Sequence, residues 1–261
     1  RFLCPDRGGY QHGARAVSAV RRERHGVGTW VMIIRGVDVA SYQTPSRELL
    51  DSWIEAGAQL LVVRAYQLGE EAGLQEITRQ WFDLAQDAGI WAWPYAWLYS
   101  TVPPEVSVRE ALDLTRSCGG DARLLALDCE EYGDEPGPSI DQILIAAGEC
   151  YRQRAQPIIY SRAGWLRQRR DLWRLAGLPG WLAQYDSDPV LIVADDAGLQ
   201  LVGKQYTSLP VDWSVWDIDA LNELVGVDPC RSLRDGLATL VGAKPYRPPS
   251  KRRLREILEG V

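Results

Sequence analysis

The sequence predicts an α/β fold, a TIM-like eight-stranded barrel with five helices that can be written (β/α)5(β)3. Short apolar runs alternate with helical patterns five times, which is typical of parallel strands joined by crossover helices. After a sixth run the connections become too short for helices, so we expect the last strands to be joined as hairpins. A chain of 261 residues can form one large domain, and closure into a barrel is the simplest way to complete such a sheet.

The predicted strands are short runs rich in β-branched and aromatic residues, which favour an extended backbone. The third run is almost wholly aromatic on one side. Two runs after the sixth strand complete the expected barrel. The eight ranges are 31–40, 59–66, 90–99, 124–128, 156–161, 181–185, 190–193 and 199–206.

Helices are predicted between the first six strands from apolar residues at helical spacing and from signals at the helix ends. Gly57 and Gly89 end the first two helical patterns, and the segment 162–176 is helical but irregular. The residues that indicate helix starts are Thr44 with Pro45, Ser107 with Glu110, and Ser139 with Gln142.

Residues 32–226 are expected to form the barrel, between a leader and a tail. Residues 1–31 are rich in Arg and Gly and lack the apolar stretch of a signal peptide. Because Met32 is the only methionine and precedes the first strand, we expect residues 1–31 to be a leader that is disordered or not native. Residues 227–261 are expected to be a tail, in which a Pro-rich linker at 244–249 precedes a short basic helix.

The composition argues against several kinds of partner. A formal charge of −6 disfavours nucleic-acid binding, which needs a positive surface for phosphates. No apolar run approaches the roughly 18 residues of a membrane span. Five cysteines without paired spacing and only two histidines argue against a zinc site, and no metal or cofactor is predicted. The unpaired cysteines indicate synthesis in a reducing cytoplasm, and the oligomeric state stays open.

Two carboxylates follow the fourth predicted strand. Asp128 and Glu130 are two residues apart, so an extended backbone places both side chains on one face, with Cα atoms roughly 6–7 Å apart. Acids this close repel each other and shift each other's pKa, which can leave one protonated and the other ionised. The alternative is an ordinary strand end that enters an acidic loop, because Glu131, Asp134 and Glu135 follow.

Acids and aromatic residues recur where the predicted strands end, at the edge of a barrel that carries its chemistry. Asp38 lies near the end of the first strand, and Asp217 follows the last one. Acids beside Tyr and Trp, without a basic partner, indicate glycoside hydrolysis, in which one acid protonates the leaving oxygen. A magnesium or calcium site is the competing interpretation, but no phosphate-binding glycine loop accompanies the acids. The aromatic residues at this edge are Tyr66, Tyr95, Trp97, Tyr160, Tyr185 and Tyr206.

Several motifs resemble those of the glycoside hydrolase family 25 lysozymes, in family order over residues 33–222. Residues 36–43 (GVDVASYQ) resemble the opening GIDVSxYQ, and residues 127–130 (LDCE) resemble the central LDxE. Two positions depart from the family pattern: its third-strand His is Ala96 here, and the Trp before Gln-Tyr is Lys204. The other matches are 157–161 (PIIYS) to PxIYT, 181–185 (WLAQY) to WIAxY, 205–208 (QYTS) to QYTS, and 216–219 (WDID) to VDLN.

The resemblance implies the same barrel and a peptidoglycan-cleaving lysozyme, an N-acetylmuramidase acting on the β-1,4 bond between N-acetylmuramic acid and N-acetylglucosamine. Carried over by motif, Glu130 is the general acid. Asp128 assists by supporting the substrate's acetamido group or the developing cation, and Asp38 and Asp217 complete an acidic floor. The six aromatic residues named above would bind the glycan. Whether an enzyme nucleophile or the acetamido group acts stays open. The lack of a signal peptide suits a bacteriophage lysin, made in the cytoplasm and acting at the bacterial cell wall.

Two other functions stay open at this point. One is a barrel that binds glycan without cleaving it, as a module of a phage tail or a cell-wall protein. Ala96 and Lys204 favour this reading, whereas retention of all four acids disfavours it. The other is an enzyme for chitin-like glycans. The chitinase pattern places several Asp at alternate positions before the final Glu, and Leu124 and Ala126 occupy those positions here.

Overall fold

The computed structural model describes residues 21–25, 29–68, 71–131, 133–189, 191, 197–208 and 211–226. The first 20 residues and the predicted tail at 227–261 lie outside this part of the chain, as does most of the predicted strand at 190–193.

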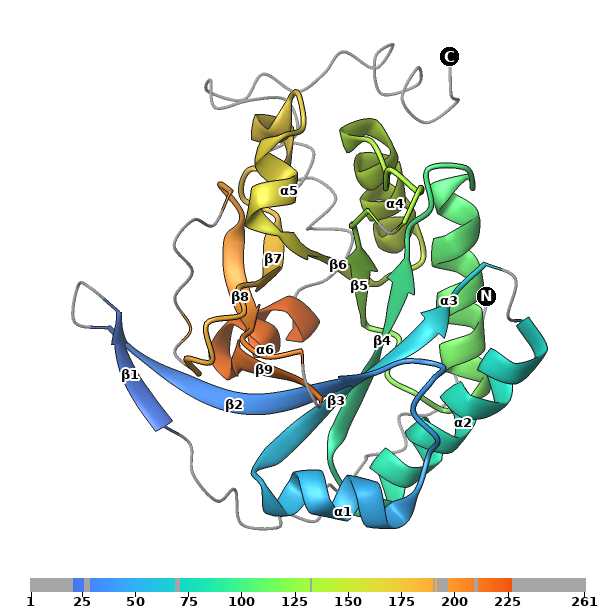
Figure 1. Cartoon of the computed structure of the whole chain (residues 1–261), viewed down its shortest axis with the longest axis vertical. Helices are drawn as coiled ribbons and strands as arrows, with labels where there is room; N and C mark the ends of the chain where they lie inside the picture. Colours follow the sequence, from blue (N-terminus) through green and yellow to red (C-terminus); the bar gives the residue numbers. More distant parts are fainter. Residues whose placement is uncertain are drawn as a thin grey trace, which may run out of the picture.

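Eight strands, β2 to β9, form a closed barrel, as the sequence predicts (Figure 1). Neighbouring strands are parallel from β2 through β8, whereas β9 is antiparallel to both β8 and β2. The pairing of β9 with β2 closes the ring. The strands are β2 (Thr29–Val39), β3 (Ala58–Tyr66), β4 (Trp91–Trp97), β5 (Leu124–Asp128), β6 (Gln156–Arg162), β7 (Pro179–Ala183), β8 (Gln200–Gln205) and β9 (Asp212–Asp217).

The closing part of the barrel differs from the prediction in two ways. β7 and β8 pair in parallel, with Gly180 beside Leu201, rather than as a hairpin. The connection at 184–199 is long enough for a parallel crossover, which needs about a dozen residues. The eighth strand is β9, which the sequence pattern did not predict because Asp212 and Ser214 interrupt its apolar residues.

A short strand precedes the barrel. β1 (Arg21–His25) pairs antiparallel with the first part of β2, from Arg21 beside Ile33 to His25 beside Thr29. Eight residues of the predicted leader therefore have strand structure, 21–25 in β1 and 29–31 in β2, which begins at Thr29 rather than at residue 31.

Helices connect the parallel strands, and one more follows β9. The predicted capping box of Ser139 and Gln142 is present, but α1 is capped by Ser46 rather than Thr44. α3 begins at Pro104, so Ser107 is buried within the helix instead of capping it. None of the helices in the described residues is both long and apolar enough to cross a membrane. They are α1 (Arg47–Glu55), α2 (Glu71–Ala88), α3 (Pro104–Ser117), α4 (Ile140–Arg152), α5 (Ala163–Arg167), the 3-10 turn η1 (Leu172–Leu175) and α6 (Ile218–Gly226).

Large aromatic rings fill the inside of the barrel. Trp216 of β9 packs edge-to-face on Trp93, with ring centres 5.2 Å apart, and lies 4.8 Å from the ring of Trp181. Glycines make room for it: a Cβ on Gly203 would lie 2.5 Å from Cε3 of Trp216, and one on Gly36 would lie 2.8 Å from its Nε1. Residues of α6 pack against the same cluster and cover the amino ends of the parallel strands.

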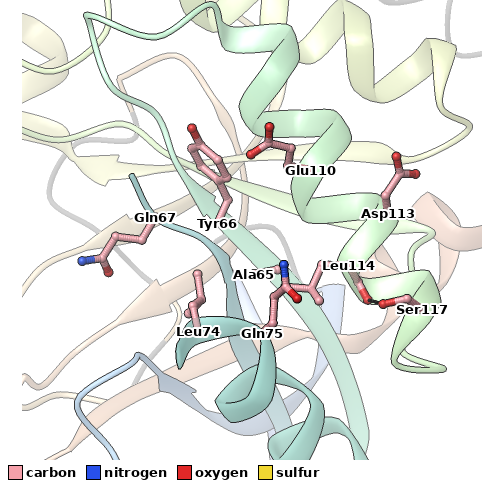
Figure 2. A pocket seen from close by; sticks show the side chains of 9 residues that line it. All are labelled: Ala65, Tyr66, Gln67, Leu74, Gln75, Glu110, Asp113, Leu114 and Ser117. Atoms are coloured by element: carbon pink, nitrogen blue, oxygen red, sulfur yellow. Dashed lines mark hydrogen bonds between the residues drawn. The ribbon is translucent and has the colours of Figure 1, made fainter. Parts of the chain in front are cut away.

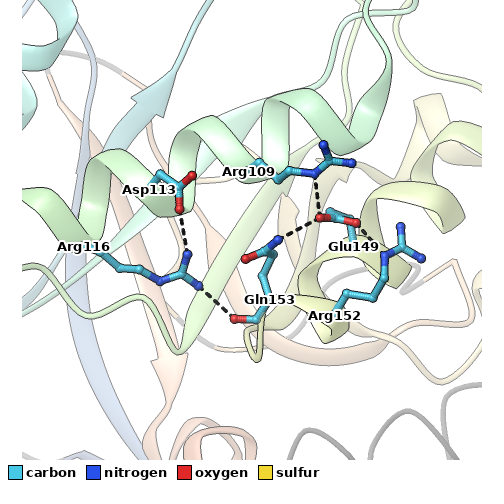
Figure 3. A network of polar contacts seen from close by, with 6 residues as sticks. All are labelled: Arg109, Asp113, Arg116, Glu149, Arg152 and Gln153. Carbon is cyan, nitrogen blue, oxygen red and sulfur yellow. Dashed lines mark hydrogen bonds and ion pairs between the residues drawn. The ribbon is translucent and has the colours of Figure 1, made fainter.

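A polar network joins α3 to α4 on the outside of the barrel (Figure 3). Glu149 of α4 is only 3% exposed and accepts hydrogen bonds from Arg109 Nε at 2.9 Å, Arg152 Nε at 2.6 Å and Gln153 Nε2 at 2.9 Å. Arg116 of α3 donates to the carbonyl oxygen of Gln153 at 2.8 Å. The network holds together the two helices that precede and follow β5.

Candidate active site

A cavity of about 150 Å³ opens at the carboxyl ends of the parallel strands. This is the edge at which the sequence predicts the chemistry. The cavity brings together acids, aromatic rings and one cation from several strands. Its lining residues are Asp38, Tyr42, Arg64, Tyr95, Trp97, Asp128, Glu130, Tyr160, Trp181, Tyr185, Gln205 and Asp212.

Three of the predicted acids meet in this cavity. Asp38 and Asp128 lie at the carboxyl ends of β2 and β5 and are 8% and 4% exposed. Alternation along β2 turns Val37 and Val39 toward the covering helices, and therefore turns Asp38 into the barrel. Glu130 follows β5 by two residues, and its side chain is 17% exposed.

The fourth acid in the cavity is Asp212, not the predicted Asp217. β9 runs antiparallel to β2, so Asp212 lies beside Asp38 and Asp217 lies at the opposite end of the pairing. The Oδ1 atom of Asp217 accepts hydrogen bonds from the backbone N–H groups of Asp219 at 3.0 Å and Ala220 at 3.1 Å. It therefore caps α6. The predicted position of Asp217 is wrong because the last strand runs in the reverse direction.

Four of the six predicted aromatic residues line the cavity, and Tyr66 and Tyr206 do not. Tyr66 lies beyond a shift in the pairing of β3 with β4 and lines a different cavity. Tyr206 packs in a separate apolar cluster. Tyr42, which was not predicted as a site residue, lines the cavity and is 71% exposed. The four predicted residues in place are Tyr95, Trp97, Tyr160 and Tyr185.

The cavity lined by Tyr66 is larger, about 430 Å³, and lies between the end of β3 and helices α2 and α3 (Figure 2). Its two acids, Glu110 and Asp113, are exposed side chains on α3. They are not gathered with other acids in a buried group. We therefore assign the chemistry to the smaller cavity.

Burial raises the pKa of every acid in the smaller cavity, and repulsion by neighbouring acids adds to the rise for Asp38, Asp128 and Glu130. Burial raises the pKa of Asp38 well above its ordinary value, and the charges of Asp212 and Asp128 add to this. Burial also raises the pKa of Asp128 strongly, and the negative charge of Glu130 raises it further. Burial brings the pKa of Asp212 to about 6 and also raises the pKa of Glu130. Acids tuned in this way can hold or release protons near neutral pH.

The prediction that the acids have no basic partner is wrong, because Arg64 of β3 lines the cavity. Its charge opposes the rise in the pKa of three acids. Alternation along β3 could have revealed it, since Leu60 and Val62 face the inside of the barrel at the same spacing. The acids that Arg64 affects are Asp38, Asp128 and Asp212.

Glu130 has a cation of its own. Nε of Arg162, the last residue of β6, lies 3.6 Å from Oε1 of Glu130, and Nη2 lies 3.5 Å from Oε1 of Glu131. Its charge opposes the rise that burial causes in the pKa of Glu130. Behind this segment, Gly137 has a φ of +70°, and a Cβ there would lie 2.4 Å from the carbonyl oxygen of Glu130. Only glycine allows the loop to pack this closely.

A hydrogen-bonded chain orients Asp38. Nε2 of Gln205 donates to Oδ2 of Asp38 at 3.2 Å. Its Oε1 accepts from the hydroxyl groups of Tyr160 and Tyr185, the latter at 3.2 Å. Because an amide has a donor end and an acceptor end, this arrangement directs the donor toward Asp38. Gln205 was not predicted as a site residue, although it lies in the QYTS motif.

An ion pair between a buried lysine and a partly exposed carboxylate fixes the segment that carries Tyr185. Lys204 is 1% exposed, and its Nζ lies 2.9 Å from Oδ2 of Asp186 and 3.1 Å from the carbonyl oxygen of Asp188. Ser187, between these two partners, has a φ of +60°, which is rare outside glycine. The ion pair therefore holds a tight turn beside the cavity.

The arrangement suits cleavage of a glycosidic bond. Oδ1 of Asp128 is buried and accepts no hydrogen bond within the described residues, which is unusual for a buried carboxylate oxygen. No three His, Cys, Asp or Glu side chains in the described ranges are grouped to hold a metal ion. An acid of raised pKa, buried carboxylates and aromatic walls can protonate a leaving oxygen and stabilise positive charge on a sugar ring.

No protein-family model and no curated protein matches the sequence, but several solved structures match the fold. The catalytic domain of endolysin ply40 from bacteriophage P40 of Listeria monocytogenes has a TM-score of 0.54 at 17% identity, covering 75% of this chain and 98% of that one. The muramidase of Acremonium alcalophilum has a TM-score of 0.56 at 19% identity, with coverages of 74% and 98%. GHIP, a glycosyl hydrolase 25 of Streptococcus pneumoniae, has a TM-score of 0.57 at 14% identity, with coverages of 73% and 92%. The chain therefore has the barrel fold that these three proteins share.

Proposed function

We propose that the chain is a peptidoglycan-cleaving lysozyme of the glycoside hydrolase 25 family. It hydrolyses the β-1,4 bond between N-acetylmuramic acid and N-acetylglucosamine. The observation that carries this proposal is the meeting of Asp38, Asp128, Glu130 and Asp212 in one aromatic-walled cavity. The likeness of the barrel to an endolysin domain, a muramidase and a glycosyl hydrolase 25 supports the same substrate class.

Glu130 acts as the general acid in this proposal. Burial raises its pKa, and its side chain is more exposed than those of Asp38 and Asp128. Its proton passes to the glycosidic oxygen as the bond between that oxygen and the sugar carbon breaks. A water molecule then supplies the hydroxyl group of the product and the proton that restores Glu130.

The other carboxylates stabilise the positive charge that develops on the sugar. Asp128 lies two residues before the acid, and its buried Oδ1, which accepts no hydrogen bond from the described residues, is the acceptor that we assign to the acetamido N–H group of the substrate. Asp38 and Asp212 extend the negative charge across the floor of the cavity, Asp212 taking the role first expected of Asp217. The rings that line the cavity supply flat faces for sugars.

The likeness to a bacteriophage endolysin domain also supports a place of action. We propose that the protein acts at the bacterial cell wall, as a phage lysin does.

The test is release of muropeptides from purified cell walls. Glu130→Gln keeps the shape of the side chain but cannot donate the proton, so we expect it to lower the rate by about 100-fold or more. Glu131→Gln is the matched control, because Glu131 is the next residue, contacts the same Arg162 and does not line the cavity. It should keep the parent rate. A parent protein that is as inert as Glu130→Gln on several wall chemistries would refute the proposal.

A second function, glycan binding without cleavage, is favoured by one observation. Arg162 lies beside Glu130 and opposes the raised pKa that a proton donor needs. A wall-binding module would use the exposed rings of Tyr42 and Tyr185 without needing that proton. Binding to glycan strands that persists in Glu130→Gln, with no product from the parent, would support this function instead.

A further inference from the structure

Arg64 is the only cation among the described residues that line the cavity. It lies on β3 beside Tyr95 of β4, where the pairing of the two strands shifts between Arg64 and Tyr66. Such irregularities redirect side chains next to active sites. The hydroxyl group of the buried Thr78 donates to the carbonyl oxygen of Arg64 at 2.7 Å, which fixes the backbone there.

The guanidinium group is held in place by neutral partners. Nε donates to the hydroxyl oxygen of Tyr95 at 2.8 Å, and Nη1 donates to Oε1 of Gln67. The Cζ atom lies 5.2 Å from the ring centre of Tyr95 and 5.5 Å from that of Trp97. Within the described part of the chain, Arg64 makes no ion pair at contact distance. Its position is fixed, and its charge is not taken up by an ion pair with one of the described acids.

Acids face Arg64 from three other strands, Asp38 from β2, Asp128 from β5 and Asp212 from β9. The tyrosines around it are Tyr42, Tyr95 and Tyr99. Burial raises the pKa of each of the three acids, and the charge of Arg64 opposes that rise.

The charge of a different arginine acts on Glu130. The nearest cation to it is Arg162, with Nε 3.6 Å from its Oε1. The two arginines therefore act on different acids.

We propose that Arg64 is a positioning residue for the reaction. It is a fixed counter-charge that favours the ionised forms of Asp38, Asp128 and Asp212. The inference rests on the proposed function, which gives these acids their roles. Buried carboxylates without a counter-charge take up protons. A neutral residue at position 64 would therefore reduce the negative charge that stabilises the positive charge developing on the sugar.

The first experiment is an NMR titration of the ¹³C-labelled carboxyl groups, which needs no turnover. In Arg64→Gln, the midpoints of Asp38, Asp128 and Asp212 should rise by about one pH unit, whereas that of Glu130 should not rise. In Arg162→Gln, the midpoint of Glu130 should rise instead. Arg35→Gln is the control, because Arg35 is exposed and lies beside Ala58, the first residue of β3, and it should move none of the four.

The second experiment is the pH dependence of wall cleavage. The acid limb of the kcat–pH profile should move to higher pH in Arg64→Gln, because the three Asp carboxylates ionise only at higher pH. On the acid side of the profile, kcat should then fall about tenfold. In Arg162→Gln the alkaline limb should move to higher pH, because Glu130 keeps its proton longer. Arg64→Lys retains the charge and should keep the acid limb of the parent.

The outcomes separate the two proposals. If the three Asp residues of folded Arg64→Gln titrate with the same midpoints as in the parent, the role of Arg64 is overturned, whether or not the protein cleaves walls. If that variant does not fold, Arg64→Lys decides: Asp midpoints that rise although the charge is present would overturn it as well. A parent protein that titrates as expected but releases no muropeptides would overturn the proposed function.

Discussion

Each acid in the cavity has a different immediate neighbour, which gives similar side chains different chemistry. Asp38 accepts a hydrogen bond from Gln205, and Asp212 lies beside it on the next strand. Asp128 has a buried oxygen that accepts no hydrogen bond from the described residues, and Glu130 lies beside Arg162. A reaction that needs one proton donor among several negative charges depends on such differences.

The pair Asp212 and Asp217, at opposite ends of one strand, allows a test at this scale. Asp212→Asn removes a charge from the cavity and should lower kcat for wall cleavage about tenfold or more. Asp217→Ala removes the cap of α6, so it should lower the free energy of unfolding by about 1 kcal/mol and leave kcat unchanged. Muropeptide-release kinetics and urea unfolding measure the two effects. The reverse pattern would contradict the assignment of Asp212.

Sequence reasoning at this scale succeeded where it needed only local geometry. Asp128 and Glu130 share a face because alternation along a strand follows from the backbone alone. Arg64 follows the same alternation, since Leu60 and Val62 of the same strand also face the inside of the barrel. Its position could therefore have been predicted from the sequence. Asp212 could not be found in this way, because its place depends on the direction of a strand that pairs with a distant segment.

At the scale of single elements, the turn after β7 carries one wall of the cavity. Tyr185 is 52% exposed, yet its hydroxyl group donates to Gln205. Lys204 holds the turn through Asp186 and the carbonyl oxygen of Asp188. The wall therefore keeps its position although it is open to solvent.

Lys204→Met keeps an unbranched side chain, one atom shorter, but removes its charge. We expect KM for wall glycan to rise severalfold with little change in kcat, because Tyr185 is no longer held while the acids are untouched. The double variant with Tyr185→Ala should show non-additive effects on KM, since both changes act on the same wall. Fully additive effects would show that Lys204 does not act through Tyr185.

The network between α3 and α4 predicts a change in stability. Glu149→Ala should lower the free energy of unfolding by about 1–3 kcal/mol, because a buried acceptor of three hydrogen bonds is lost. Asp113→Ala is the control. Its exposed pair with Arg116 should contribute under about 1 kcal/mol.

This effect should depend on pH. Burial alone would raise the pKa of Glu149, but hydrogen bonds from Gln153, Arg152 and Arg109 lower it overall. The stabilisation is therefore fully present above the unfolded pKa of about 4.3 and is lost as the pH falls through the folded pKa. Urea unfolding of parent and variant at pH 7 and pH 3 should show the difference shrinking in acid. A constant difference would contradict the argument.

At the scale of the whole molecule, the barrel is a ring whose first and last strands meet at a seam, β2 against β9. Trp216 of β9 fills the inside of the ring between Gly36 and Gly203, against Trp93 and Trp181. Closure therefore depends on one large ring that fits only beside residues without side chains.

Gly203→Ala should lower the free energy of unfolding by about 1–3 kcal/mol, because its Cβ would lie 2.5 Å from a ring carbon of Trp216 in a closely packed interior. Gly148→Ala is the matched control. In helix α4 its new Cβ would meet only Arg152 Nη1, at 4.0 Å, so it should stabilise the protein by about 0.5–1 kcal/mol. Urea unfolding compares them. Equal stability of Gly203→Ala and the parent would contradict the packing argument.

The part of the fold that depends on local sequence patterns could be predicted. The strands through β7 and the capping box of Ser139 follow from runs of residues close in sequence. The parallel pairing of β7 with β8 and the reversed β9 depend on partners far apart in the chain, which no local pattern encodes. The misplacement of Asp217 follows from this, because its position depends on the direction of β9.

The pairing of the first barrel strand with the last also determines when the acids can come together during synthesis. Asp38 belongs to the first strand of the ring and Asp212 to the last, so the two become neighbours only when ribosomal synthesis of the domain is almost complete. A nascent chain that stops before residue 212 carries its other three acids on an open sheet with one wall absent. The four acids can therefore meet only after the last strand of the barrel has been made.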